Sequence, residues 1–487
     1  MFGLVTGLAI LLVFCLICVC FFEFINGFHD TANAVATVIY TKSLHPTTAV
    51  IWSGFLNFLG VITGGMLSYK GFQILINSFN EGVFTEGIGV ATSIIKLLPV
   101  NDMLDTGVMV SISVILAALI TSIVWNLGTW YFGIPCSSSH TLIGSLIGAS
   151  MGFSFAYFDG FSKVNTEKAQ EIFLSLLLSP VFGFSMALLL MIILKRLLGR
   201  AHLIFQSPKD GSTPPKWIRG ILITTCSLVS FFHGSNDGQK GVSLALLVLI
   251  CFLPGTYALN HTKNIQEVGK IMAEIKPVLT KFDASTLSSE QIGTYQTTLK
   301  VVTEMETVLQ KPNIEPRDKY TMRKDISVLR KQLDIIIKDK ILPLNADETK
   351  LLKTDIKLLK PYVEFAPFWI VLLISVSLGV GTMVGWKRIV VTIGERIGKE
   401  HLTSAQGACA EIVAAMTIGL ATNFKLPVST THVLSSGVAG TMVAKGGLRN
   451  LRVKTVRNIA LAWVLTLPVC ISGAAFLFYV FKALLVK

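Results

Sequence analysis

The stretch Asn26-Gly27-Phe28-His29-Asp30-Thr31-Ala32-Asn33-Ala34 follows directly on a hydrophobic run from Leu4 to Phe22. A lipid bilayer penalises every unsatisfied polar group by several kcal/mol. A carboxylate, an imidazole and two amides beside such a run therefore indicate a functional site. Gly27 predicts a bend that breaks the helix, so that freed backbone groups can hold a ligand.

A second copy of this motif lies further along the chain. His233-Gly234-Ser235-Asn236-Asp237-Gly238-Gln239-Lys240-Gly241 also follows an apolar run, Ile221 to Phe232. Gly234 predicts a second broken helix at the matching position. The two copies align glycine with glycine and aspartate with aspartate, which places Asn33 opposite Lys240.

A second pair of motifs supports the same division of the chain. Pro135-Cys136-Ser137-Ser138-Ser139-His140 matches Pro427-Val428-Ser429-Thr430-Thr431-His432, and Gly148 matches Gly440. Two polar motifs that recur in the same order indicate an internal repeat. In membrane proteins such repeats are typical of transporters, with the binding site between the repeats.

The composition places the whole chain in a lipid bilayer. Of its 487 residues 52% are hydrophobic and only 15% are charged, and the mean hydropathy is +0.64. Soluble proteins carry about 25% charged residues. The net charge of +13 calls for no nucleic-acid partner, because Lys and Arg in the loops of a membrane protein orient it. The first apolar run is too long for a cleaved signal peptide, and the spacing of the eight cysteines fits no zinc site.

The predicted fold class is an all-α polytopic membrane protein built from two inverted repeats of about five spans each, with broken helices and re-entrant hairpins. A bilayer crossing needs about 20 apolar residues, and we expect about ten to twelve crossings. The spans are predicted near residues 4–40, 47–67, 107–131, 135–157 and 170–196, and near 217–258, 366–386, 405–424, 427–443 and 458–481.

The basic residues of the loops predict the orientation. With both termini outside, the inside loops carry sixteen Lys and Arg residues and the outside loops, apart from the polar segment 260–364, carry five. This excess favours that orientation. It also places the two serine hairpins on opposite sides, from which both would reach the middle of the bilayer.

Polarity divides the chain into five segments. Segment 260–364 is polar, has helical periodicity and is predicted to be a soluble helical insertion, placed outside by the topology. The expected segments are a first transmembrane repeat (1–196), a basic cytoplasmic linker (197–216), the start of the second repeat (217–259), the insertion (260–364) and the rest of the second repeat (365–487).

These motifs resemble the PiT family of inorganic phosphate transporters, in particular its bacterial low-affinity members. The segments Trp125 to Gly133 and Gly381 to Trp386 are also similar to those members. The resemblance covers both hydrophobic halves and implies an inverted-repeat fold, a homodimer and a place in the bacterial inner membrane. It implies import of inorganic phosphate coupled to protons or sodium. It also implies that phosphate travels as a neutral complex with a divalent metal such as Mg²⁺.

The two hydroxyl triplets are the predicted phosphate ligands. Hydroxyls donate hydrogen bonds without the strong hold of a bidentate arginine, which suits a carrier that must release its cargo. Each triplet follows a proline and precedes an apolar helical run, so it falls at a helix N-terminus that attracts anions. Ordinary capping is the alternative, but one cap needs one hydroxyl. The six residues are Ser137, Ser138, Ser139, Ser429, Thr430 and Thr431.

Asp30 and Asp237 cannot face a phosphate dianion in a low dielectric unless a cation or proton lies between them. We therefore expect each to bind a coupling ion, to accept a proton, or to ligate a metal that travels with phosphate. The alternative is that they cap a broken helix end. The amides predicted to add ligands for the substrate are Asn33, Asn236 and Gln239.

Lys240 departs from the pattern of the PiT family, which has Asn at this position. An ammonium beside Asp237 could replace a bound sodium ion, and this favours proton coupling. His140 and His432 are further candidates for the coupling proton, although their matching repeat positions equally suit a structural hydrogen bond. Glu23 is a candidate because an intramembrane glutamate is costly to bury.

Four other functions fit the sequence less well. A serine hydrolase needs one nucleophile, whereas the serine motif is duplicated and no G-x-S-x-G elbow is present. A channel fits broken helices in inverted halves less well than a carrier does. A sodium-coupled phosphate symporter, or a permease for another tetrahedral oxyanion such as sulfate, is the remaining alternative. Sulfate carries no proton at neutral pH and cannot donate to either aspartate.

Overall fold

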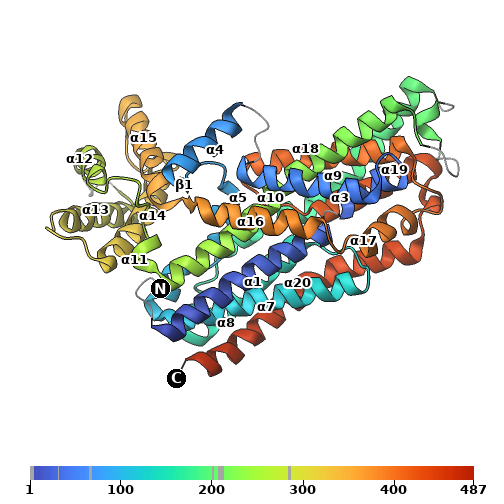
Figure 1. Cartoon of the computed structure of the whole chain (residues 1–487). Coiled ribbons are helices and arrows are strands. Elements are labelled where there is room, and N and C mark those ends of the chain that lie inside the picture. Colours follow the sequence, from blue (N-terminus) through green and yellow to red (C-terminus); the bar gives the residue numbers. More distant parts are fainter. Residues whose placement is uncertain are drawn as a thin grey trace.

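The chain is almost entirely helical, which confirms the all-α prediction. The computed structural model describes residues 5–30, 32–64, 69–199, 202–206, 213–282 and 287–486. Within these ranges the two strands have two residues each. Figure 1 shows long helices packed side by side in a bundle, with a separate group of helices at one end of it.

The elements of the first half are α1 (Thr6–Asp30), α2 (Ala32–Tyr40), α3 (Pro46–Ile62), α4 (Tyr69–Glu81), β1 (Val83–Phe84), α5 (Gly89–Ile95), α6 (Val100–Thr106), α7 (Val108–Tyr131), α8 (Ser138–Tyr157), α9 (Thr166–Leu198) and the 3₁₀ turn η1 (Leu203–Phe205). The second half contains α10 (Lys216–Phe252), α11 (Pro254–Tyr257), β2 (Ala366–Pro367), α16 (Phe368–Thr382), α17 (Lys387–Val391), the π-helical turn η3 (Thr392–Arg396), α18 (Ser404–Asn423), α19 (Thr430–Gly446), the 3₁₀ turn η4 (Leu448–Asn450) and α20 (Val453–Leu485). The insertion contributes α12 (Gln266–Thr280), α13 (Ser289–Leu309), α14 (Pro316–Lys338) and α15 (Ala346–Val363).

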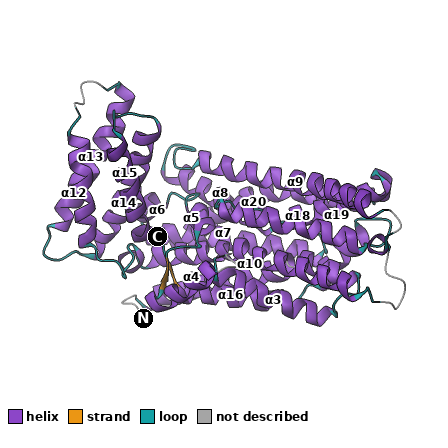
Figure 2. Cartoon of the chain, turned by 90° about the horizontal axis from the view of Figure 1, so that it is seen from above, coloured by secondary structure: helices purple, strands orange, loops and turns teal. Residues whose placement is uncertain are grey.

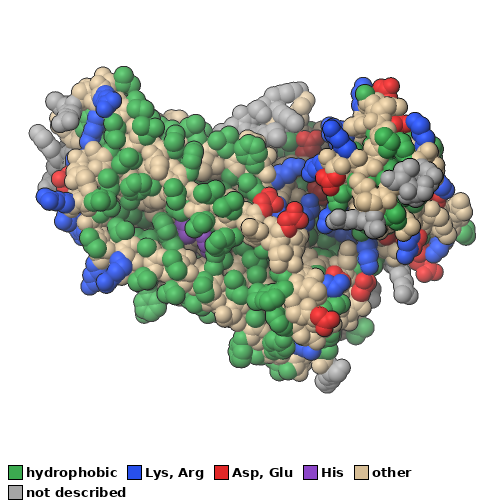
Figure 3. All heavy atoms as spheres, turned by 180° about the vertical axis from the view of Figure 1, so that it is seen from behind, with side chains coloured by type: hydrophobic (Ala, Val, Ile, Leu, Met, Phe, Trp, Pro, Cys, Tyr) green, Lys and Arg blue, Asp and Glu red, His purple; other side chains and the backbone are tan. Residues whose placement is uncertain are grey.

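The outer surface of the bundle is apolar. Ile10 on α1, Val181 on α9 and Val464 on α20 are all more than 60% exposed, and Figure 3 shows apolar side chains covering the bundle between charged ends. Among the described residues, five helices are long and apolar enough to cross a bilayer, and α16 with the bent segment after it would make a sixth. These helices mark a multi-pass membrane protein, while the larger number of crossings stays a prediction.

Long helices of each half pack against long helices of the other half. The first helix of each half packs against the second long helix of the other, so α1 contacts α16 and α10 contacts α3. The same exchange recurs later in the chain, where α8 packs on α20 and α19 packs on α9 (Figures 1 and 2). Each half therefore completes its packing only with the other. This reciprocal pattern suits two related halves, and their inverted orientation stays a prediction.

The bends predicted at Gly27 and Gly234 are wrong. Gly27 lies inside α1, and α10 runs without a break past Gly234. A side chain at Gly234 would collide with the carbonyl oxygen of Asn57 on α3, and one at Gly27 would collide with that of Leu378 on α16. Both positions therefore require glycine, because a helix of the other half packs directly against the backbone there. Thr31, which follows α1, lies outside the described residues.

The insertion forms its own apolar core from α12 to α15. Three of its helices begin with a capping box, which satisfies amide groups that a helix start otherwise leaves free. It docks on the bundle through Tyr320, whose hydroxyl donates to the Asn101 carbonyl at 3.0 Å, and Arg323, which donates to the Ala258 carbonyl at 2.8 Å. Strands β1 and β2 pair antiparallel and link the segment before α5 to the start of α16.

The start of α1 and the end of α20 lie at the same end of the bundle as the insertion (Figures 1 and 2). The loop between α9 and α10 and the segment that contains α17 lie at the opposite end (Figure 1). The predicted orientation requires these basic segments to lie at the end of the bundle opposite the insertion. Which end faces the cytoplasm stays a prediction.

Replacing Gly234 by Ala should disrupt the α3–α10 contact, because the added methyl group meets backbone that cannot move independently of its helix. We expect a large loss of monodisperse protein after detergent extraction, measured by size-exclusion chromatography. Gly220→Ala is the matched control on the same helix, since nothing lies within 4 Å of that position. Equal yields of the two variants would contradict the packing role of Gly234.

Candidate functional site

The N-terminal turns of α8 and α19 meet inside the bundle. Ser137 caps α8 and Ser429 caps α19, each accepting the amide hydrogen of the histidine three residues on. Those histidines, His140 and His432, occupy matching positions, and their ring centroids lie 4.3 Å apart. Two positive helix ends therefore converge on one place, as an anion site requires.

The two helices are reached from opposite ends of the bundle. The turn before α8 lies at Gly133, next to the carbonyl of Arg388, at the end away from the insertion. The turn before α19 contains Lys425, which packs against Gly89 at the start of α5. The two turns thus lie towards different ends of the bundle, and the inverted relation of the two halves stays a prediction.

The second hydroxyl of each triplet is left without a partner. Ser138 and Thr430 occupy matching positions in the first turns of α8 and α19, and both are at most 1% exposed. Within the described part of the chain neither hydroxyl oxygen makes a hydrogen bond. A buried hydroxyl without a partner costs about 1–3 kcal/mol. Two of them at matching positions therefore point to a ligand that binds both.

The third hydroxyl of each triplet crosses to the other half. Thr431 donates to Asp30 Oδ1 at 2.8 Å. Ser139 accepts a hydrogen bond from the Lys240 ammonium and donates to the Val428 carbonyl at 2.8 Å. Each triplet is therefore tied to the polar motif of the opposite half.

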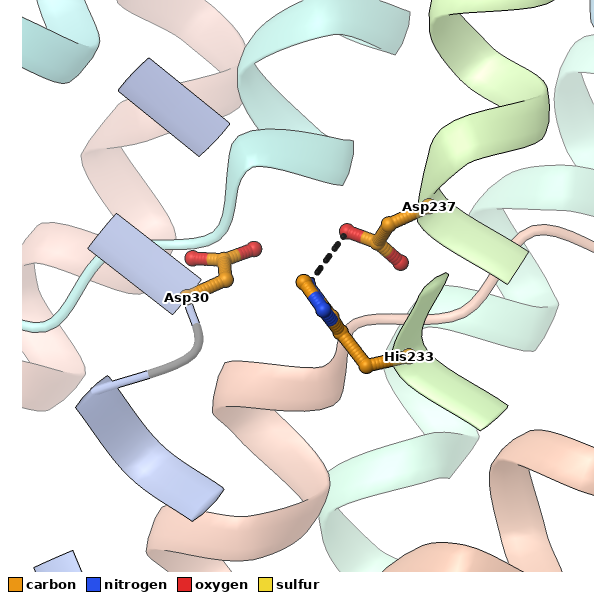
Figure 4. Close-up of side chains that lie close together, drawn as sticks. All are labelled: Asp30, His233 and Asp237. Atoms are coloured by element: carbon orange, nitrogen blue, oxygen red, sulfur yellow. Dashed lines mark ion pairs between the residues drawn. The ribbon is translucent and has the colours of Figure 1, made fainter. Parts of the chain in front are cut away.

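Asp30, His233 and Asp237 face one another (Figure 4). Each offers one ligand atom, and the three atoms lie within 4.8 Å of one another. His233 Nε2 is 3.5 Å from Asp237 Oδ2, while its Nδ1 is 2.9 Å from the Asn57 side-chain oxygen. Two carboxylates and an imidazole fit a divalent metal. Sequence reasoning named both aspartates and missed His233, although it opens the second motif.

Lys240 neutralises Asp237. Its ammonium lies 2.6 Å from Asp237 Oδ2, and both side chains are completely buried. On the other side of the site, His29 Nδ1 is 3.1 Å from Asp30 Oδ1 and its Nε2 is 3.2 Å from the Thr129 hydroxyl. The two aspartates therefore differ in their partners: one has a fixed cation, the other a histidine and Thr431. The side chain of Asn33, the repeat counterpart of Lys240, lies outside the described residues.

Asn236 and Gln239 make hydrogen bonds that position the segments around the site. Asn236 donates to the Thr422 hydroxyl and the Leu426 carbonyl and accepts the amide hydrogen of Val428, so it clamps the turn before α19. Gln239 accepts the amide hydrogen of Val90 at 2.8 Å at the start of α5. Both amides are engaged inside the protein, and their predicted contact with substrate stays a prediction.

The remaining candidates surround the same centre. Glu23 accepts a hydrogen bond from Asn26 at 3.2 Å, and its side chain packs against Gly241 on α10. His140 Nδ1 lies 2.9 Å from the Ser137 hydroxyl, and His432 stacks on Trp463 with centroids 4.0 Å apart.

Asn126 is a further ligand candidate, and the sequence already suggested that it lines the same cavity as Thr129. Neither amide atom of buried Asn126 on α7 has a partner among the described residues. The candidate ligands are buried: His140 is 6% exposed, and the two aspartates, the two hydroxyl triplets, Asn236 and Gln239 are at most 3% exposed.

A bundle with an apolar surface that buries paired carboxylates, histidines and hydroxyls in its interior defines a multi-pass membrane transporter, because such groups are kept inside a membrane only for a function. Comparison with known proteins narrows this class. The model of the phosphate transporter family matches residues 26–474. The chain belongs to this family, whose members are transporters and not enzymes.

The similarity to individual relatives extends over nearly the whole chain. The low-affinity inorganic phosphate transporter PitA of Escherichia coli is 38% identical, covering 97% of this chain and 96% of its own. The low-affinity inorganic phosphate transporter of Buchnera aphidicola from Acyrthosiphon pisum is also 38% identical, with 96% of both chains covered. A solved structure described as "The sodium-dependent phosphate transporter" is similar with a TM-score of 0.51 and 21% identity, covering 98% of this chain and 100% of that one.

Replacing Lys240 by Met should lower the free energy of unfolding by about 3–5 kcal/mol, because it leaves the buried Asp237 carboxylate without its cation. Adding Asp237→Asn should recover most of that loss. Unfolding in a fixed detergent, followed by tryptophan fluorescence, measures both. Lys445→Met is the control, since it breaks a partly exposed pair with Glu400 that is worth about 0–1 kcal/mol. An unchanged stability of Lys240→Met would mean that the pair does not hold the site.

Proposed function

We propose that this protein imports inorganic phosphate, as a neutral complex with a divalent metal, together with a proton. The observation that carries the proposal is the pair of partnerless buried hydroxyls, Ser138 and Thr430, at the meeting of two helix N-termini. These two hydroxyls and the two helix ends supply donors for a phosphate without an arginine. Neutral donors of this kind can bind the anion and still release it.

Charge balance supports a metal as part of the cargo. Asp30 beside a phosphate dianion would be strongly repelled at close range in a low dielectric. A divalent cation held between phosphate and the carboxylates of Asp30 and Asp237 removes that repulsion, and His233 adds a nitrogen ligand. Oxygen ligands suit Mg²⁺, and an imidazole also admits Mn²⁺ or Co²⁺. The metal is therefore cargo and not a resident cofactor.

The Lys240–Asp237 pair supports a proton as the coupling ion. The ammonium, 2.6 Å from Oδ2, already neutralises Asp237, so its Oδ1 atom can still contact the metal of the cargo but no net charge is left for a separate sodium ion. A sodium ion at that carboxylate would have to displace a buried cation of the same charge. A proton needs no such space.

We further propose that the protein is a homodimer in the bacterial inner membrane, with both termini and the insertion outside. The excess of Lys and Arg in the loops at the other end of the bundle supports this orientation.

Phosphate uptake into liposomes tests the function. Purified protein should take up labelled phosphate when an inward proton gradient is imposed, more strongly with Mg²⁺, and an inward sodium gradient alone should have little effect. Ser138→Ala should raise the KM by about tenfold or more, since a hydrogen bond to a charged ligand is worth about 1.5–3 kcal/mol. Its thermal stability should be unchanged, because no hydrogen bond within the protein is lost. Ser145→Ala, which removes a hydroxyl bonded to the Thr141 carbonyl, is the control on the same helix.

Uptake of labelled sulfate but not of phosphate would show that the transported substrate is another tetrahedral oxyanion. Phosphate uptake driven only by sodium would keep phosphate and reject the proton. A normal KM in Ser138→Ala would show that the partnerless hydroxyls do not bind phosphate.

Lys240→Asn restores the residue that occupies the matching position in the first half. If the ammonium replaces a sodium ion, this variant should gain phosphate uptake that responds to an inward sodium gradient and lose part of its response to protons. Initial rates in the same liposomes measure both. Lys445→Asn, at an exposed pair, is the control and should keep the wild-type response. A sodium-independent Lys240→Asn variant with normal proton-driven uptake would show that Lys240 has no part in ion choice.

A further inference from the structure

A hollow on the outside of the bundle is separate from the phosphate site. It has a volume of about 610 Å³ and lies between the end of α7 and the bent segment that joins α16 to η3. Tyr131 is 61% exposed and Phe132 is 73% exposed, so the hollow opens to the outer surface. Aromatic rings and cations line it, among them Trp130, Tyr131 and Phe132 at the end of α7 and Lys387, Arg388 and Arg396 on the bent segment.

Two of these cations, Lys387 and Arg388, lie apart from any carboxylate of the described residues. Neither forms an ion pair there, and no Asp or Glu of the described residues lines the hollow. Arg396 also borders a smaller hollow of about 220 Å³, which Glu395 and Glu400 line. The uncompensated positive charge of the larger hollow therefore lies at Lys387 and Arg388.

The guanidinium of Arg388 is held in place by the end of α7. Its Nη1 atom donates to the Tyr131 carbonyl at 2.7 Å. Its central carbon lies 5.2 Å from the centroid of the Trp130 ring and 5.1 Å from that of Tyr131. A guanidinium has five N–H donors, so most of them stay available to an anion. An arginine fixed in this way suits the planar, bidentate recognition of phosphate oxygens.

The hollow continues into an apolar face of α7. Val124 and Tyr131 are seven residues apart and share one face of the helix, and Val124 is 64% exposed. Trp and Tyr are enriched where the hydrocarbon of a bilayer meets its headgroups. The segment with α17 lies towards the end of the bundle away from the insertion (Figure 1). The aromatic rings and cations of the hollow therefore suit the headgroup level, and Val124 suits the hydrocarbon beside it.

We propose that this hollow binds an anionic phospholipid, with the lipid phosphate at Lys387 and Arg388 and an acyl chain along the face of α7 that carries Val124. Charge complementarity decides the choice, because basic pockets between membrane helices bind acidic headgroups. A free phosphate ion would gain nothing from the apolar face, and a zwitterionic lipid would bring a third cation to the two already present. The proposal requires neither the phosphate cargo nor the predicted orientation.

The hollow borders residues that reach the phosphate site. Trp130 Nε1 donates to the Gly385 carbonyl at 2.9 Å, which links the end of α7 to the bent segment. Thr129 precedes Trp130, and its hydroxyl lies 3.2 Å from His29 Nε2 in the site. A headgroup that contacts both segments would stabilise this link. Anionic lipid should therefore also raise the melting temperature of the purified protein.

Native mass spectrometry of the full chain tests the site. Protein in a nonionic detergent is titrated with phosphatidylglycerol or with phosphatidylcholine. In Lys387→Gln/Arg388→Gln the apparent affinity for phosphatidylglycerol should fall about tenfold or more, since the variant loses hydrogen bonds to a charged ligand, and phosphatidylcholine binding should stay unchanged. Lys454→Gln/Arg457→Gln is the matched control, because it removes two exposed cations at the start of α20 and should keep the wild-type affinity.

Three results of this titration would each overturn the proposal. Equal losses in the two double variants would show that surface charge in general attracts the lipid. Equal wild-type affinities for the two lipids would show that the charge of the headgroup is not recognised. Displacement of phosphatidylglycerol by inorganic phosphate, but not by chloride at the same ionic strength, would assign the hollow to a free anion.

Photocrosslinking locates the lipid and also covers the case in which the double variant does not fold. A phosphatidylglycerol with a photoreactive group near the top of an acyl chain should label the peptide from Val124 to Phe132 in the wild type, as read by peptide mass spectrometry. Arg388→Lys keeps the charge but loses the planar fork, so it should reduce this labelling. Wild-type labelling on α9 or α20 with none on this peptide would contradict a lipid held in the hollow.

Discussion

Two helix N-termini held together in a buried place are the constraint on which the rest of this structure depends. Each brings free amide groups and a positive end of a helix dipole into a medium with little water to screen them. The chain holds them there with capping serines, with Asn236 clamping the turn before α19, and with hydroxyls that cross to the opposite half. The central carboxylates then balance a field that would otherwise be positive.

The distribution of charge around that place is unequal although the motifs are repeated. Asp237 has the Lys240 ammonium, whereas Asp30 has His29 and Thr431. Here one carboxylate is paired with a buried ammonium, whereas the other is bound by a histidine and a hydroxyl.

The sequence predicted the parts of this molecule that depend on local pattern. Apolar runs located the long helices, and the duplicated motifs predicted that the two hydroxyl triplets lie near Asp30 and Asp237. The glycines were misread, because a glycine in a polar stretch looks like a bend and only the neighbouring helix reveals close packing. The roles of Gln239 and Asn236 depend on α5 and on the turn before α19, whose positions no local pattern encodes.

The exchange of helices between the halves has a consequence for how the protein is made. Since α1 packs on α16 and α8 packs on α20, the first half emerges from the ribosome before the helices that fill its grooves exist. Its glycine-lined surfaces and its polar motif therefore lack their native partners until the insertion and the remainder of the chain have been synthesised. The native packing of the first half can therefore be completed only when translation is nearly over.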